Sequence, residues 1–150
     1  QIAADLATVK EAAAKQGREG QLRFGIRSHV LVRETAEEAR DAAEALIAGS
    51  SDRMRENRHD AMGAQSHADA RMRDVAKAAA ESDYWLSDTL WAGITTIRHG
   101  AGVTIVGSAE QVTETIQGYI DLGITSFCLS GYPHDEEATR FGELVLPAFR

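Results

Sequence analysis

Predicted strands alternate with predicted helices along most of this chain, and that alternation limits the possible folds more than any other feature. Residues 24–33 alternate with a period of two and include several branched side chains, which predicts a strand. Ile26, Val30 and Val32 fall on one parity of this strand. Arg27 and His29 fall on the other, so one face is expected to be apolar and the other polar.

Helix-start signals follow the strands closely. Thr35 and Glu38 form a T-x-x-E capping box, and Ser108 and Gln111 form a second one after a predicted strand at 103–106. Another strand is predicted at 124–130, with a last helix from about Asp135 to Pro147. Together with an N-terminal helix that ends near Gly17, this order predicts an α/β fold with three parallel strands and helical crossovers.

Residues 50–90 interrupt the alternation. They are rich in Asp, Arg, His and Ala and poor in large apolar residues, so we interpret them as an insertion with one or two exposed helices. A closed (β/α)8 barrel takes about 250 residues. The 150 residues of this chain are therefore too few for a whole barrel, and residues 1–150 are predicted to form a single partial domain.

Composition excludes several functional classes. The formal net charge of -7 disfavours nucleic-acid binding, because an acidic surface repels phosphates. No apolar run is long enough to cross a membrane, and residues 1–5 do not resemble a signal peptide. A single cysteine cannot form an intramolecular disulfide, which fits a reducing, cytoplasmic location. Cys128 lies mid-strand among apolar residues, so it is predicted to be a core residue. His59 and His67 lack metal-ligand spacing, and no metal site is predicted.

Ligands of parallel α/β proteins bind beyond the carboxyl ends of the strands, and three segments place polar residues near such positions. Arg27 and His29 either point into a binding site or alternate outward on an edge strand, and the pattern alone leaves both interpretations open. Arg98 lies in a glycine-bearing loop and either clamps an anion or is a solvated arginine. Tyr132, directly after the last strand, offers a phenolic donor or is a packed turn residue, and we favour the functional interpretation.

These segments together resemble one family. The stretches that carry the resemblance are 24–33, Leu90-Trp91-Ala92-Gly93, Arg98-x-Gly-Ala-Gly and residues 129–138 with their Ser-Gly-Tyr-Pro-His run. They are similar to FMNH2-dependent alkanesulfonate monooxygenases of the bacterial-luciferase-like superfamily. The resemblance implies the C-terminal half of a luciferase-like (β/α)8 barrel, roughly its sixth to eighth strands, with 50–90 as a lid over flavin and substrate.

The resemblance also implies a site and a reaction. Its catalytic residues would be Arg27, His29, Arg98 and Tyr132, and its cofactor-binding residues His29, Gly131 and Tyr132. FMNH2 would come from a separate NAD(P)H-dependent reductase, and O2 would be used to cleave an alkanesulfonate to an aldehyde and sulfite. The arginines suit the anionic groups, and His29 suits proton transfer. The parent protein is expected to be a homo-oligomer.

Several departures and alternatives remain. Thr95-Thr96-Ile97 is more polar than the family pattern, and His99 replaces a small residue, which affects substrate choice more than fold. The alternatives are an FMNH2-dependent monooxygenase of a sulfone or another small molecule, a deazaflavin-dependent oxidoreductase, and a non-catalytic barrel fragment that needs a partner chain. The isolated chain is expected to be inactive and to associate through open sheet edges.

Overall fold

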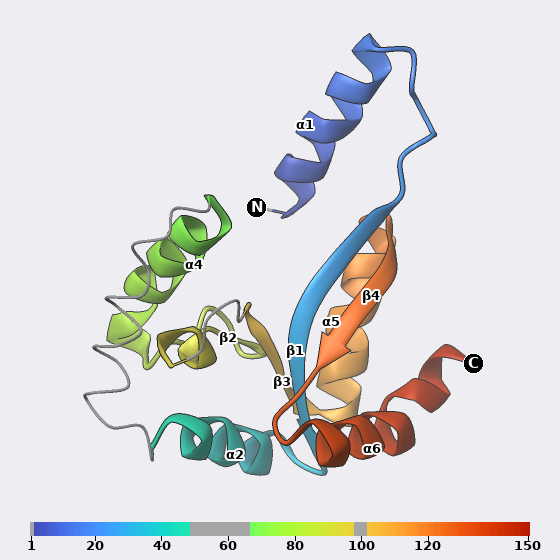
Figure 1. Cartoon of the computed structure of the whole chain (residues 1–150). Helices are drawn as coiled ribbons and strands as arrows, with labels where there is room; N and C mark the ends of the chain where they lie inside the picture. Colours follow the sequence, from blue (N-terminus) through green and yellow to red (C-terminus); the bar gives the residue numbers. More distant parts are fainter. Residues whose placement is uncertain (1, 49–66, 98–101) are drawn as a thin grey trace.

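A four-stranded mixed sheet forms the centre of the molecule (Figure 1). The computed structural model describes residues 2–48, 67–97 and 102–150. The strands are β1 (Phe24–Arg33), β2 (Leu90–Trp91), β3 (Thr104–Ser108) and β4 (Ile124–Ser130). The α-helices are α1 (Ile2–Lys15), α2 (Ala36–Ala48), α4 (His67–Ala78), α5 (Ala109–Asp121) and α6 (His134–Leu144). The 3-10 helices are η1 (Ala80–Ser82), η2 (Gly93–Thr96) and η3 (Leu146–Phe149).

The strand order is β2-β3-β1-β4. β1 is parallel to both of its neighbours, with residues 29–33 paired to β3 and residues 24–29 paired to β4. β2 is antiparallel to β3, which the sequence did not predict. The three predicted strands are therefore present and parallel. Their order differs from a (β/α)8 barrel, in which consecutive strands lie side by side, because β1 separates β3 from β4.

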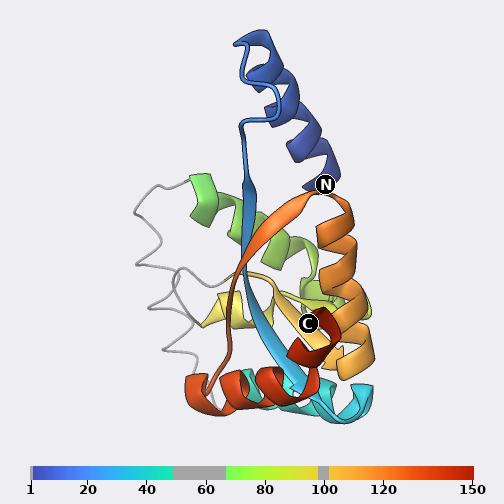
Figure 2. The same ribbon diagram turned by 90° about the vertical axis from the view of Figure 1, so that its right-hand side faces the viewer.

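The two faces of the sheet carry different helices (Figures 1 and 2). Val30, Val32 and Ile105 pack with residues of α5, α6 and η3, and we call this side the α5 face. Leu31 and Val106 pack with α2, η2 and the segment 84–97, and we call this side the α2 face. Alternation along β1 therefore assigns Arg27 and His29 to the α2 face, opposite the valines.

Local signals in the sequence account for the helix starts. Ser108 caps α5 and forms the predicted reciprocal capping box with Gln111. Thr35 and Glu38 form the predicted box at α2, with the Glu38 amide donating to Thr35 Oγ1 over 3.2 Å and the Thr35 amide donating to Glu38 Oε2 over 3.1 Å. Each such cap contributes about 1 kcal/mol.

The core combines aliphatic side chains of β1 and β3 with Trp91 and with small or aliphatic residues of α2 and α5. Leu31, Val32 and Ile105 are at most 2% exposed, and Trp91 is fully buried. Burying one such side chain stabilises the fold by about 1.5–3 kcal/mol. Gly93 follows from this packing, because a Cβ at that position would overlap the indole ring of Trp91.

The prediction for Cys128 was wrong. The residue is exposed, although it lies in the middle of β4. Its register partner is Arg27, which is also exposed, so the residues described here leave this part of the α2 face uncovered. An apolar run identifies a strand but does not say how much of each face its neighbours cover.

Part of the predicted insertion lies outside the described residues. Its described portion contains α4 and η1, which agrees with the one or two helices expected in the insertion, followed by the turns and short β2 strand that lead to η2. Within the described ranges, no helix has the length and apolar character needed to cross a membrane.

Candidate functional site

His29 lies at the centre of a row of polar side chains on the α2 face. It is 3% exposed, and its register partners are Thr104 in β3 and Ser130 in β4. Register partners in neighbouring strands point to the same side of a sheet. Three residues from three strands therefore form one polar row, placed at the carboxyl end of β4 and the amino end of β3.

Contacts hold the imidazole of His29 from two directions. Ser130 Oγ lies 2.9 Å from His29 Nδ1, within hydrogen-bonding distance. The Tyr132 ring is tilted by 43° against the imidazole, with 5.2 Å between the ring centroids. Tyr132 in turn contacts the ring of His134 with a centroid separation of 4.6 Å. The end of β4 and the turn that follows it thus orient the ring of His29.

Thr104 completes the row and is chemically unusual. The residue is 2% exposed, and its Oγ1 is buried without a hydrogen-bond partner in the described structure. Leaving a hydroxyl buried and unpaired costs about 1–3 kcal/mol. A ligand that supplies a hydrogen-bonding atom at this position would remove that cost.

The other predicted site residues are distributed differently. Arg27 is exposed on the α2 face, two residues before His29 in β1, and it makes no ion pair within the described ranges. Arg98 and the loop around it lie outside the described residues. His29 and Tyr132 are therefore the two predicted residues that the structure brings into contact.

Gly131 has a packing explanation. A Cβ at this position would lie 2.8 Å from the carbonyl oxygen of Val30 and would overlap the side chain of Glu137. The turn after β4 passes β1 and α6 too closely for a larger residue. The geometry of the described residues thus accounts for this glycine without a cofactor.

Glu137 connects α6 to the end of β1. Its carboxylate is buried, and Arg33 donates to both of its oxygens over 2.9 and 3.1 Å. Arg140 Nη1 donates to the same group over 2.7 Å. This hydrogen bond is the main cause of the raised pKa of Arg140, with a smaller contribution from Glu136. The cluster is satisfied by its own members, so we interpret it as structural.

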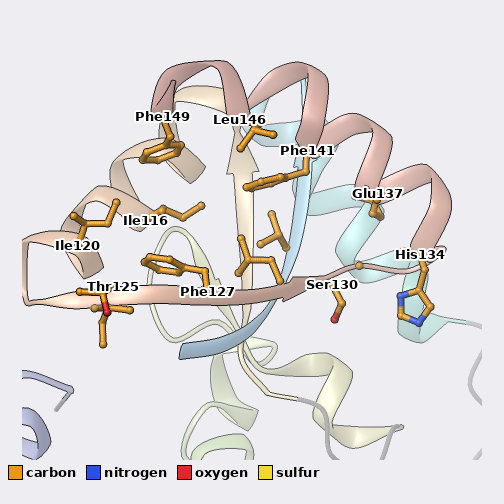
Figure 3. Close-up of a pocket in the computed structure, with 15 residues that line it drawn as sticks. Ile116, Ile120, Thr125, Phe127, Ser130, His134, Glu137, Phe141, Leu146 and Phe149 are labelled. Carbon is orange, nitrogen blue, oxygen red and sulfur yellow. The ribbon is translucent and has the colours of Figure 1, made fainter. Parts of the chain in front are cut away.

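A large apolar groove lies on the opposite side of the sheet from His29. Its volume is about 910 Å³, and it runs between β4, α5 and α6 (Figure 3). Phe127, Phe141 and Phe149 line it, whereas the Ser130 hydroxyl points to the other side of β4 in this view. Ser130 lies at the rim of both features, so the groove and the polar row adjoin at the end of β4 but face opposite sides of the sheet.

Comparison with known proteins identifies the family. Residues 1–126 match the family model described as luciferase-like monooxygenase. The chain belongs to the luciferase-like monooxygenase family. Members of this family are oxidoreductases that depend on a flavin or a deazaflavin.

One solved structure has a fold similar to that of this luciferase-like chain. It is the coenzyme F420-dependent tetrahydromethanopterin reductase from Methanopyrus kandleri, which is 17% identical with a TM-score of 0.52. The likeness covers 99% of this chain but 42% of the reductase. The chain thus spans less than half the length of a protein with a similar fold.

The polar row of this luciferase-like chain fits a flavin-type ligand in its chemistry. Flavins present many oxygen and nitrogen atoms along a ring system and a side chain. Thr104 offers an unpaired hydroxyl, and His29 offers an oriented imidazole beside it. Within the described ranges, no group of three or more His, Cys, Asp or Glu residues could hold a metal ion.

Sequence reasoning missed Thr104 and gave no role to Ser130. Thr104 is the one hydroxyl in the apolar run of residues 103–106, and that exception is the signal that could have drawn attention to it. Its proximity to His29 depends on the pairing of β1 with β3, which the sequence does not reveal. Ser130 lies within the Ser-Gly-Tyr-Pro-His motif, where tyrosine was the more obvious candidate.

Proposed function

We propose that the polypeptide containing this chain is a two-component flavin-dependent monooxygenase. It would use FMNH2 from a separate reductase, together with O2, to convert an alkanesulfonate to an aldehyde and sulfite. Family membership supports flavin-type redox chemistry, and the motif resemblance supports FMN and the organosulfur substrate. The observation that carries the proposal is the buried, oriented imidazole of His29 between Ser130 and Tyr132.

His29 would move or hold a proton during the reaction. Ser130 at Nδ1 would orient the imidazole for proton exchange with a ligand. A fixed ring orientation matters because a proton-transfer group must be within hydrogen-bonding reach of its target. Reduced flavin, when bound, would supply the two electrons that activate O2, and His29 would supply proton transfer.

The remaining site residues would exclude water and bind the anionic substrate; they are Tyr132, Arg27 and Arg98. The Tyr132 ring covers one side of His29 and would help exclude water from it. Arg27 is on the same face as His29, and its exposed guanidinium suits an anionic sulfonate. Arg98 is proposed for the same task on the basis of the motif alone. Residues 50–90 are proposed to act as the lid.

The decisive assay is sulfite release from a series of alkanesulfonates by the full-length protein, supplied with FMN, NAD(P)H and a flavin reductase. Replacing His29 with Ala should lower kcat by about 10²–10⁴-fold, the usual contribution of a proton-transfer group. Gln117→Ala, on the exposed face of α5, is the control and should leave the rate unchanged. Near-normal turnover by His29→Ala would remove the imidazole from the mechanism.

The same preparation distinguishes the alternatives. Sulfinate release from sulfones without sulfite release from sulfonates would indicate a sulfone monooxygenase. Oxidation of a reduced deazaflavin without oxygen consumption would indicate a hydride-transferring oxidoreductase. Failure to bind any of these cofactors would indicate a non-catalytic role that needs a partner chain.

A further inference from the structure

Thr104 contributes to the polar row a hydroxyl that forms no hydrogen bond with any residue that the structure describes. It begins β3, beside His29, and Ile105 and Val106 follow it in the core. The other hydroxyls around this region are engaged. Ser130 meets His29, Ser28 donates to the Val103 carbonyl over 2.7 Å, and Thr95 donates to the Ala92 carbonyl over 2.6 Å.

Valine would fit the same space and avoid the cost of an unpaired hydroxyl. Threonine and valine have nearly the same shape, and an apolar isostere at an unpaired buried position is neutral or stabilising. Both threonine and valine are β-branched, so both are favoured in strands. Folding alone therefore gives no reason for threonine at position 104.

We propose that the Thr104 hydroxyl is a ligand-binding group of the flavin site, acting beside His29. The inference rests on the proposed function, which supplies the class of ligand. The position supports it, because Thr104 and His29 are register partners on the same face of the sheet. A flavin oxygen or nitrogen would give the hydroxyl the hydrogen bond that it lacks in the protein.

The test compares the ligand-free stability and the flavin affinity of three variants of the full-length protein. Thr104→Val removes the hydroxyl and keeps the shape, and Thr104→Ser keeps the hydroxyl. Thr113→Val is the matched control, because it makes the same atomic change on α5, where Thr113 donates to the Ala109 carbonyl. FMN affinity is measured by fluorescence quenching, and stability by the thermal midpoint without ligand.

Thr104→Val should bind FMN about 3- to 10-fold more weakly than the wild type, which is the usual loss for one neutral hydrogen bond. Its thermal midpoint should be unchanged or higher. Thr104→Ser should retain near wild-type affinity, and Thr113→Val should not alter affinity. Weaker FMN binding with an unchanged or higher midpoint indicates a ligand contact. A structural role of the hydroxyl would instead lower the thermal midpoint of Thr104→Val.

Two results would overturn the inference for different reasons. If the wild type binds FMN and Thr104→Val binds it equally well, the hydroxyl is not a ligand group, and the proposed function stands. If the wild type binds neither oxidised nor reduced FMN, the proposed function fails, and the role of Thr104 fails with it.

Discussion

Gly131 shows how one residue can set the distance between three elements. It lies at the end of β4, against the backbone of β1 and the side chain of Glu137 in α6. Because the Val30 carbonyl is part of the sheet, it cannot move aside as a side-chain tip could. The residue that directly precedes Tyr132 is thus confined by packing, and the position of the tyrosine against His29 depends on that confinement.

Replacing Gly131 with Ala should destabilise the fold by about 1–3 kcal/mol, since overpacking forces backbone shifts. Gly142→Ala is the control. A Cβ there meets nothing within 4 Å, and alanine is preferred to glycine in a helix, so this variant should gain up to about 1 kcal/mol. Urea denaturation measures both. Equal stabilities for the two variants would show that the turn after β4 has room for a methyl group.

At the scale of elements, α6 is held to β1 by a buried carboxylate. Glu137 is 3% exposed, whereas its partners Arg33 and Arg140 partly reach solvent. The ion pair between Arg33 and Glu137 joins β1 to α6. Its geometry also places the start of α6 next to the turn that carries Tyr132.

Glu137→Gln should lower the free energy of unfolding by about 2 kcal/mol. This is less than the loss for a fully buried ion pair, because both guanidinium groups can be partly solvated. Glu136→Gln removes the same charge from an exposed position with one partner, Arg140, and should change stability by less than about 0.5 kcal/mol. Similar losses from both variants, measured in urea at neutral pH, would contradict a specific role for Glu137.

The sequence largely predicts the individual strands and helices, but it does not predict which strands pair with each other. The bounds of β1 and β4 match the prediction because alternation and turn residues are local signals. Both capping boxes formed for the same reason. The antiparallel β2, the exposure of Cys128 and the register of Thr104 beside His29 depend on pairings between distant segments. The site was predictable to the extent that its residues follow their strands directly, as Tyr132 does.

For the whole molecule, the central position of β1 decides which residues meet. Its carboxyl half pairs with β3 and its amino half with β4, so His29 alone has a partner on each side. In the strand order of a closed barrel, β3 would separate β1 from β4. Ser130 would then be too far from His29 for the hydrogen bond at Nδ1. The polar row therefore exists only if β1 lies between β3 and β4.

A disulfide test distinguishes the two strand orders in the 150-residue chain. Cys128 is its single cysteine, and Arg27 is the register partner of Cys128. Arg27→Cys would place two cysteines on neighbouring strands, about 4.8 Å apart between Cα atoms, within the range that a disulfide bridges. With β3 between them, the separation would be about 9.6 Å, which is too far.

Mild oxidation of the dilute variant, followed by thiol titration and mass measurement, should show an intramolecular disulfide. Ile26→Cys is the control, because its side chain points to the opposite face and should leave both thiols free. Two free thiols in Arg27→Cys would instead indicate the barrel order and would separate Ser130 from His29.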